Sequence, residues 1–531
     1  MFRHIQPDNL INLALEALGD YVCTLCLQFM ELYHKGSVHG ELEKTCKLLK
    51  ALLCDTVPQS IANEVTCKLL RSVDNLYDDL HDLIKEPWCE EILQVLVQSV
   101  IHPAVTKLSF GSDHLHGLSY GCEWNFIVPF VYGAIRDLSN LKKLQIGKLR
   151  CVDWTDWFVN ISGVAANLEE FTFMCNCDDN VLEVISESCR MLRCLNVYES
   201  IYVTDSSVDA ILKFQHLVQL NVEKTSISEF GVTSLLNGLV NKRASGFGYT
   251  WTCSSQLLSF GCSEITSSHL ILLVDKFPNL IAINLTCDRN CNISALKRLE
   301  NLKMLRLSCV KFPQIEQLLI TFWNQLQCLD ICDVGAINVK AIGETCTSLK
   351  CLHITSSDTS SIPAFEENLS PLPGFKSVIC LCLRLEYNPE MVEYILCQCV
   401  NVRVVDITIA VGNDNTILES VLKRNPLKYL EEFNWWTWSP CKLASLTAKQ
   451  IIEHCPCLVV LRGPFVWQRC GDVRKLCKDV ARVMYLEAQV LWSAKLCAGN
   501  VWIMTWASVY NFHAGIWPSI QAKALVYNCI L

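Results

Sequence analysis

One apolar pattern recurs along most of this 531-residue chain and limits what the chain can fold into. The pattern L-x-x-L-x-L, with other apolar residues allowed, begins at Val105 and occurs fourteen times in one phase. Its steps average about 27 residues, a period at which a single unit cannot bury its apolar face and must stack on its neighbours. Clear copies are Leu192-Leu195-Val197, Leu302-Leu305-Leu307 and Leu326-Leu329-Ile331.

Each repeat predicts a short strand followed by a helix. The fourth and sixth positions of the pattern point to the core and the residues between them point outward, because side chains alternate along a strand. The spacing between patterns is helical, as in residues 179–189, where Val181, Leu182, Ile185 and Cys189 share one face. Repeats of this kind are typical of a leucine-rich-repeat solenoid. We therefore predict an α/β horseshoe with a parallel concave sheet and convex helices.

The two ends of the chain lack the repeat and predict separate parts. The N-terminal region reads as helices at about 8–33, 41–53 and 58–71 with further turns to Leu96, and surface excursions are expected near 242–248 and 355–376. After about Phe465 a Trp-rich helical tail either caps the last repeat or is foreign to the fold. The predicted parts are an N-terminal helical region at 1–103, a leucine-rich-repeat domain of about 14 repeats at 104–464, and the tail at 465–531.

The composition indicates a folded, acidic protein that binds other proteins or small molecules. Hydrophobic residues make up 51% and charged residues 19% of the chain, which is too apolar for a disordered segment. The balance of 45 basic and 54 acidic residues gives a net charge of -9, and no long basic run is present. Binding to nucleic acid, which depends on basic surfaces, is therefore not expected.

The 32 cysteines are expected to be reduced. The start of the chain, from Met1 to Asp8, lacks the basic, apolar and cleavage segments of an export signal, so we expect a cytoplasmic or nuclear location. The one C-x-x-C pair, Cys23 and Cys26, has no second Cys or His pair at zinc spacing, so packing is preferred over metal binding. No metal or cofactor is expected.

Four cysteines occupy one slot, three residues before the leading Leu or Val of a repeat. They are Cys189, Cys346, Cys399 and Cys455, and other repeats place Phe214, Phe277 or Trp323 there. A position shared by cysteine and large aromatic residues is a burial slot, since free cysteine packs as a small hydrophobe. These thiols need no chemical role.

Neither catalysis nor a membrane span is expected. The sequence has no G-x-S-x-G, H-E-x-x-H or P-loop motif, so we predict no catalytic residues and no enzyme. Between Lys495 and Lys523 the chain lacks acidic and basic residues, but polar residues interrupt this stretch, so a spanning helix is not expected. The interrupting residues are Asn500, Thr505, Ser508, Asn511, His513 and Pro518.

The cysteine slot, and turn stretches such as Val203-Thr204-Asp205 after a strand, resemble the cysteine-containing leucine-rich repeats of F-box/LRR proteins. The resemblance covers roughly residues 105–463 and is specific to the repeat subtype. It implies a substrate receptor of a cullin–RING ubiquitin ligase, in which the repeats hold the target and an N-terminal helical motif docks on a cullin adaptor.

The first helix fits two adaptor-binding motifs, and each departs from its family pattern. As an F-box, residues 7–18 follow the opening spacing, with Asn9 in place of an acidic residue and without the later Cys-x-x-Trp element. As an elongin-binding box, Ala14 stands in place of Cys, and residues 57–61 (Val-Pro-Gln-Ser-Ile) would form the cullin-selecting Φ-P-x-x-Φ segment. Both place Leu10, Ala14 and Leu18 on one helical face, and packing of this face on the next helices is the alternative.

The outward positions of the strands are the candidate surface for a protein target. Their charges are mixed in sign, which fits a protein or peptide better than a polyanion. Tyr, Trp and Arg are favoured because they dominate the energetics of interfaces. A scaffold or inhibitor with no ubiquitin role is the alternative function, since a fold does not fix a function. The candidate target-binding residues are Tyr198, Arg306, Asp330, His353, Arg384, Asp406 and Trp436.

Overall fold

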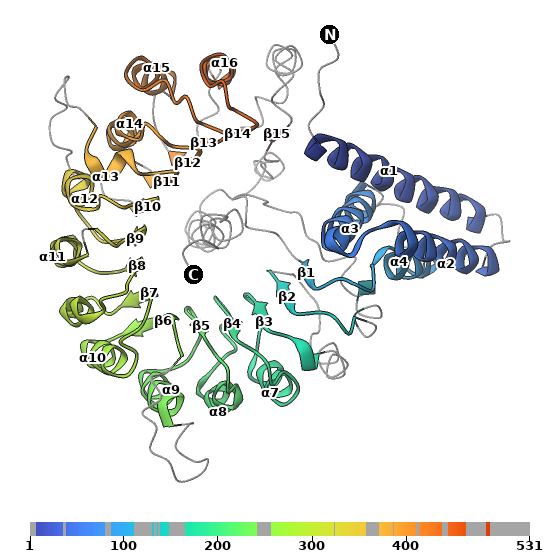
Figure 1. Ribbon diagram of the computed structural model, residues 1–531, viewed down its shortest axis with the longest axis horizontal. Coiled ribbons are helices and arrows are strands. Elements are labelled where there is room, and N and C mark those ends of the chain that lie inside the picture. The colour runs from blue at the N-terminus through green and yellow to red at the C-terminus, as the bar shows by residue number, and fades with distance from the viewer. Residues whose placement is uncertain are drawn as a thin grey trace, which may run out of the picture. The chain divides into compact units, whose positions relative to one another are not determined.

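The computed structural model divides into two compact units, which we describe separately (Figure 1). Unit 1 holds the described residues up to Ile227, and unit 2 holds those from Ser228 on. The structure describes residues 7–34, 39–79, 87–110, 130–131, 135, 138–147, 165–241, 256–322, 324–356, 371–385, 387–409, 414–437, 444–463 and 485–488.

Several sequence predictions fall outside these residues. They include the excursion at 242–248, most of the excursion at 355–376, Trp323, and all of the tail except 485–488. The uncharged stretch between Lys495 and Lys523 also lies outside them. Within the parts of the chain that the structure describes, none of the helices combines the length and the apolar run that crossing a bilayer requires.

Unit 1 begins with a helical region, as predicted. Helix α1 packs on α3 and α4, and α2 packs on α4. The third helix starts later than its sequence predicts, because Pro58 begins a short 3₁₀ turn before it. The elements are α1 (Pro7–His34), α2 (His39–Thr56), η1 (Gln59–Ile61), α3 (Ala62–Asp79) and α4 (Pro87–Val100).

Asn63, at the start of α3, joins this helical region to the first strand, β1 (Lys107–Phe110). Its Oδ1 accepts hydrogen bonds from the backbone N–H groups of Thr106, at 2.9 Å, and Lys107, at 3.1 Å. Its Nδ2 donates to Oγ1 of Thr106 at 3.0 Å. Because the outer edge of a sheet leaves backbone groups unpaired, Asn63 partly satisfies the open end of the repeat stack.

The repeats of unit 1 form a parallel sheet in which each strand pairs with the next in sequence. Leu144 lies opposite Phe171, which lies opposite Leu195, so the same position of every repeat meets across the sheet. The remaining elements are β2 (Lys143–Ile146), η3 (Ala165–Asn167), β3 (Glu170–Phe173), α7 (Asp179–Ser188), β4 (Cys194–Asn196), η4 (Asp205–Ser207), α8 (Val208–Lys213) and β5 (Gln219–Val222).

Unit 2 repeats the same plan, with parallel strands on the inner side of a curve and helices outside (Figure 1). Its strands are β6 (Ser259–Ile265), β7 (Ala282–Cys287), β8 (Met304–Ser308), β9 (Cys328–Cys332), β10 (Cys351–Ser356), β11 (Cys380–Leu385), β12 (Val404–Ile409), β13 (Glu432–Thr437), β14 (Val460–Gly463) and β15 (Tyr485–Ala488). Its helices are α9 (Glu229–Asn241), α10 (Ser267–Lys276), η5 (Ile293–Arg298), α11 (Phe312–Thr321), α12 (Val339–Thr345), α13 (Pro373–Lys376), α14 (Pro389–Gln398), α15 (Asp414–Arg424) and α16 (Ala444–His454).

The described part of the C-terminal tail differs from its predicted helical structure. Residues 485–488 form strand β15, which pairs in parallel with β14, so that Leu486 lies opposite Leu461. The edge of β14 offers unpaired backbone groups to a following segment, and Tyr485 and Leu486 suit a strand better than a helix. A local pairing of this kind has no signature in the repeat pattern.

The predicted inward positions form the core of both units. Leu195, Leu305 and Leu329, each at the fourth position of its repeat, are at most 1% exposed. The sixth positions, such as Val197 and Ile331, are fully buried. The α/β leucine-rich-repeat solenoid predicted from the periodicity is therefore confirmed.

The cysteine slot lies at the end of the repeat helices. Cys189, Cys346 and Cys399 are the C-cap residues of α7, α12 and α14, and Phe277 has the same place after α10. In each case the slot carbonyl accepts the N–H of the leading residue, as from Leu192 to Cys189 at 3.3 Å. All four slot cysteines are fully buried, as predicted. The slot residue thus turns the chain from helix to strand while filling the core.

The repeat fold predicts that Leu329→Asp lowers the free energy of unfolding by about 4 kcal/mol, because it places an unpaired carboxylate in the core. Urea denaturation followed by circular dichroism measures this change. Ile320→Asp is the matched control, since Ile320 is 64% exposed on α11. Equal stability of the two variants would contradict the assignment of Leu329 to the core.

The burial of the slot cysteines predicts slow alkylation in the folded protein. Burial raises the pKa of Cys189 and of Cys346 to about 12, and the thiolate is the reactive species. Timed iodoacetamide labelling with peptide mass spectrometry should find these thiols on the order of a hundredfold slower to react than the exposed Cys54 and Cys457. Equal rates in native buffer would contradict the buried slot.

Candidate functional site

Six of the seven predicted target-binding residues lie on consecutive strands of unit 2. Arg306 is on β8, Asp330 on β9 and His353 on β10, and these three are register partners across the sheet. Asp406, on β12, continues the same row beyond Cys382 of β11. The structure therefore brings residues far apart in the sequence into one row.

Arg384 and Trp436 stand in the neighbouring row. Arg384 of β11 lies opposite Thr408 of β12, which lies opposite Trp436 of β13. The two rows are two residues apart along each strand and so project from the same face of the sheet. The parallel pairing places all six side chains on one surface of unit 2.

Asp330 is the centre of an ion-pair cluster within the first row. Its Oδ2 lies 2.9 Å from Nδ1 of His353 and 3.4 Å from Nε of Arg306. Nε2 of His353 lies 3.2 Å from Oγ1 of Thr355, so the imidazole has a polar neighbour at each nitrogen. A carboxylate between two bases fixes the direction of both neighbouring side chains.

The surroundings of Asp330 favour its ionised form. Burial is the largest single influence and raises the pKa of this carboxyl group, but the charges of His353 and Arg306, the hydrogen bond from His353 and the charge of Arg384 together outweigh it. The pKa of Asp330 is therefore lowered from its usual value. The cluster is a charged one at neutral pH, held inside the protein by its own partners.

The expected exposure of the seven residues is wrong, because all of them are buried. Asp330 is fully buried, and Asp406, the most accessible of the set, is 8% exposed. Strand pairing alone does not explain their burial. Thr172 and Asn196 of unit 1 stand in equivalent positions of paired strands and are only half-buried. In the Asp330 cluster, the side chains of Arg306 and His353 reach Asp330 across neighbouring strands, so each is buried together with its ion-pair partner.

The outward face of unit 1 is more accessible and less charged. Its central row consists of small polar side chains on β1 to β5, all of them half-buried. At the strand starts, Lys107 and Lys143 are exposed, and Nζ of Lys143 lies 2.6 Å from Oε1 of Glu170. The members of the central row are Ser109, Gln145, Thr172, Asn196 and Asn221.

Tyr198, the remaining predicted residue, belongs to unit 1 and follows β4. Nζ of Lys224 lies 5.2 Å from the centre of its ring, within the range of a cation–π contact, and 3.8 Å from Oε1 of Glu199. Its backbone N–H donates to Oδ1 of Asn196 at 3.1 Å. These contacts hold Tyr198 in a local cluster at the strand end, outside the rows of unit 2.

A row of cysteines that sequence reasoning missed lies beside the charged row in unit 2. Cys328, Cys351 and Cys380 are register partners on β9, β10 and β11, and they pack with Ala282 and Met304. Hydrogen bonds to Cys328 and Cys380, followed by burial, raise the pKa of Cys351. The sequence feature that could have predicted this row is a Cys-Leu pair at the start of each of the three strands. Among the described residues, no group of three or more Cys, His, Asp or Glu side chains could hold a metal ion.

Helix α1 presents two different apolar faces. Val22, Leu25, Cys26 and Phe29 form the buried face, on the helix side that packs against α3 and α4. Beside this face Ala14 is exposed, and Leu18 is half-buried at the border between the two, whereas the side chain of Leu10 lies outside the described part.

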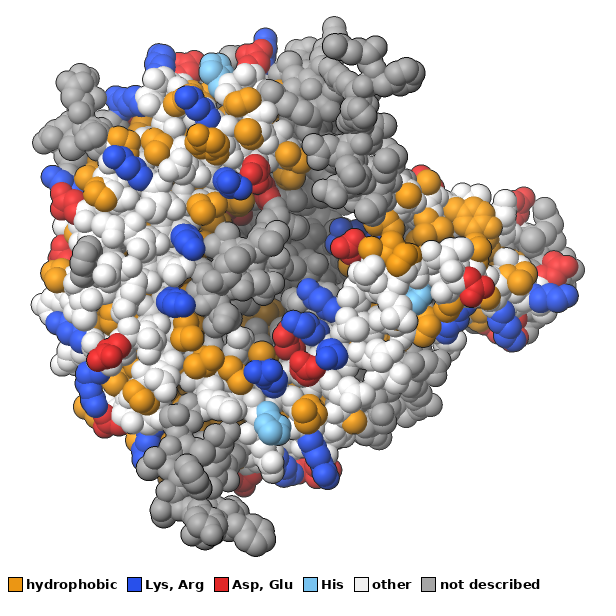
Figure 2. Space-filling view, viewed as in Figure 1, with side chains coloured by type: hydrophobic (Ala, Val, Ile, Leu, Met, Phe, Trp, Pro, Cys, Tyr) orange, Lys and Arg blue, Asp and Glu red, His pale blue; other side chains and the backbone are white. Residues whose placement is uncertain are grey.

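The outward face of α1 extends beyond the predicted residues. Ala17 is also exposed, and the ring of Tyr21 is 55% exposed, so four apolar residues follow one another at helical spacing. Hydrophobic side chains gather on the visible face of these N-terminal helices (Figure 2). The sequence spacing identified the start of this stripe and missed Tyr21, because an aromatic residue within a helix gives no sign of its exposure.

The charged cluster predicts that Asp330→Asn lowers the free energy of unfolding by about 3 kcal/mol at pH 7, because Arg306 and His353 lose the charge between them. Since the folded pKa of Asp330 is lowered, the contribution of its charge is present above the unfolded pKa of about 3.9. It is lost as the pH falls through the folded value. The difference between variant and wild type should therefore shrink below pH 4 in denaturation curves.

Asp288→Asn is the control, because Asp288 is exposed in the turn after β7. A pH-independent difference between Asp330→Asn and wild type would contradict an ionised Asp330.

Comparisons with known proteins leave the function to be argued from these residues. No family model matches the chain, and no curated protein matches it. Among solved structures, the chain is similar to one in the Rad7 and Elc1 complex from yeast, at 14% identity and a TM-score of 0.45, covering 78% of this chain and 92% of that one. It is also similar to the internalin InlF of Listeria monocytogenes, at 15% identity and a TM-score of 0.24, covering 69% and 95%. Similarities this distant carry no argument about function.

Proposed function

We propose that this protein is a non-catalytic subunit that recruits a protein target to a cullin–RING ubiquitin ligase. In this proposal α1 docks on a cullin adaptor, and the outward faces of the repeat sheets hold the target. The observation that carries it is the second apolar stripe on α1, in which Ala14, Ala17 and Tyr21 are exposed and Leu18 is half-buried. The repeat subtype behind the helix supplies the link to ubiquitin ligases.

The outward stripe of α1 has the form of a helix that binds in a groove. Ala14, Ala17, Leu18 and Tyr21 repeat at three- and four-residue spacing, the pattern by which an amphipathic helix lays its apolar face into a partner. Ala14, Ala17 and Tyr21 are exposed, whereas Leu18 is half-buried and stands four residues before the buried Val22, so the stripe borders the face that packs on α3 and α4. Two small alanines at its centre allow a close approach of the partner.

The proposal includes two kinds of adaptor, one that binds an F-box and one of the elongin type. The stripe is common to both motifs, since each uses Leu10, Ala14 and Leu18 on one face. In the segment proposed for cullin selection, Pro58, Gln59 and Ser60 are exposed, whereas Val57 and Ile61 are half-buried. An elongin-type complex would place a cullin against this exposed turn.

Target recognition is divided between the two sheet faces. The half-exposed hydroxyl and amide groups of unit 1 offer hydrogen bonds without a large cost of desolvation. We propose that the buried set of unit 2, with Tyr198 of unit 1, determines which target fits, because the contacts within this set fix the shape of the surrounding surface. That set is Arg306, Asp330, His353, Arg384, Asp406 and Trp436.

The adaptor proposal predicts that Leu18→Asp with Tyr21→Asp abolishes adaptor binding and leaves the repeats folded. A central apolar anchor is worth 2 kcal/mol or more, so affinity should fall at least about 30-fold. Co-expression with each adaptor, followed by co-purification and calorimetry, measures the loss. Circular dichroism of the same variant should match that of wild type.

Leu48→Asp is the matched control, because Leu48 is 68% exposed on α2 and lies outside the stripe. It should bind the adaptor as wild type does. If wild type recovers neither adaptor with its cullin, the ubiquitin role is excluded and the scaffold or inhibitor function replaces it. Unfolding of the double variant would instead assign the stripe to the core.

A further inference from the structure

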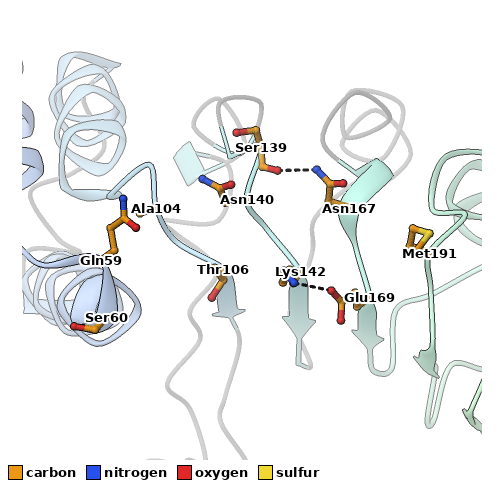
Figure 3. A pocket seen from close by; sticks show the side chains of 10 residues that line it. All are labelled: Gln59, Ser60, Ala104, Thr106, Ser139, Asn140, Lys142, Asn167, Glu169 and Met191. Carbon is orange, nitrogen blue, oxygen red and sulfur yellow. Dashed lines mark hydrogen bonds and ion pairs between the residues drawn. The ribbon is translucent and has the colours of Figure 1, made fainter.

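A polar cleft of about 590 Å³ lies in unit 1 at the starts of its first strands (Figure 3). One wall comes from the η1 turn, with Gln59 and Ser60, and the other from the segments that precede β2 and β3. Met191, 52% exposed, supplies an apolar surface at the far end. The remaining lining residues are Ala104, Thr106, Ser139, Asn140, Lys142, Asn167 and Glu169.

Asn140 occupies a repeat position whose side chain bridges to the preceding repeat in several other repeats. Nδ2 of Asn167 donates to the carbonyl of Ser139 at 2.9 Å, and Nδ2 of Asn401 donates to the carbonyl of Lys376 at 2.8 Å. Oγ of Ser348 donates to the carbonyl of Asn324 at 2.7 Å. Asn140 makes no side-chain hydrogen bond among the described residues, because the segment before it belongs to the junction with the helices. Its exposed amide faces the cleft instead.

The opposite wall also carries polar groups without partners in the described structure. Gln59 and Ser60 are exposed, and neither side chain forms a hydrogen bond there. In Figure 3, Asn140 stands between Gln59 on one side and Asn167 on the other. Amides that present both a donor and an acceptor match the N–H and C=O groups of an extended backbone. The cleft thus has the chemistry to pair with a peptide main chain.

The rim of the cleft is positively charged. Nζ of Lys142 lies 2.8 Å from Oε1 of Glu169, and this hydrogen bond, with the nearby charges of Arg193 and Lys143, lowers the pKa of Glu169. Lys143 pairs with Glu170, whereas Arg193 and Lys107 form no ion pair among the described residues. Of these residues only Lys142 and Glu169 line the cleft, while Lys107 follows the lining residue Thr106, and Arg193 and Lys143 lie close enough to Glu169 to lower its pKa. Basic residues thus outnumber acidic ones beside the cleft, which favours a ligand with negative charge.

We propose that this cleft binds an extended acidic peptide segment of a partner protein. The amides of Asn140 and Gln59 pair with its backbone, and its acidic side chains lie against Lys107 and Arg193. The site differs from the α1 stripe and from the rows of the sheet but shares Gln59 and Ser60 with the turn proposed for cullin selection, so the peptide and a cullin would compete there. The test below uses the chain alone, so its outcome does not depend on adaptor or cullin binding.

The test selects peptides from a displayed library of random dodecapeptides against the full chain, and measures each selected peptide by fluorescence anisotropy. The enriched peptides should be rich in Asp and Glu, and their binding should weaken with rising salt. Asn140→Ala should weaken binding about fivefold to tenfold, the effect of one or two hydrogen bonds. Lys107→Glu with Arg193→Glu should weaken it more than tenfold, because repulsion replaces attraction.

Two matched controls should bind as wild type does. Asn301→Ala changes an exposed asparagine at the same repeat position in unit 2, and Lys213→Glu reverses an exposed charge on α8. Gln59→Ala tests the other wall independently if a repeat variant loses stability. The proposal is overturned if no peptide is enriched, or if the selected peptides bind the cleft variants and the controls equally.

Discussion

In the described part of the chain, nearly every repeat is tied to the one before it by two successive backbone N–H groups that donate to a single carbonyl. Lys142 and Lys143 donate to Thr106, at 2.8 and 3.0 Å, and Gln327 and Cys328 donate to Lys303 at the same two distances. Because this contact recurs at the start of almost every described strand, it sets one register for each sheet. Side chains at equivalent positions are then brought together in rows. The charged row, the cysteine row and the polar row of unit 1 all follow from this backbone contact.

The turn after many strands carries a conformational cost that this register offsets. Glu199, Lys224, Cys309 and Asp333 have φ between 52° and 63°, in the left-handed region that disfavours side chains by roughly 1–2 kcal/mol. In three of the four, the N–H donates to a carbonyl of the next repeat, as from Asp333 to Thr355 at 3.1 Å. The turn therefore extends the ladder by one hydrogen bond before the chain leaves for the helix. Its geometry is set by the stacking of repeats rather than by local preference, which explains why glycine is absent there.

The fold could be predicted from the sequence because its repeats are periodic. The inward position of Leu329, the slot of Cys189 and the helical region before the repeats all follow from spacing alone. Burial of Arg306 and His353 does not, since the pattern says which face a residue takes and nothing about which side chains will reach one another across it. The cleft beside Asn140 could not be predicted from the sequence either, because it depends on a side chain that makes no hydrogen bond to the preceding repeat among the described residues. Such features arise from contacts between different repeats, or between a repeat and another element. The sequence of a single repeat therefore does not predict them.

The two sheet faces differ in how readily they can exchange partners. A ligand that contacted Asp330 directly would have to compete with His353 at 2.9 Å and expose or rebury charges already removed from water, which costs several kcal/mol. The hydroxyl and amide groups of Thr172, Asn196 and Asn221 are half-exposed, so a ligand replaces only water at their free hydrogen-bonding positions. Recognition is therefore easier on unit 1, where the α1 stripe and the cleft also lie. The buried charges of unit 2 are better suited to holding one arrangement of the face than to forming new contacts.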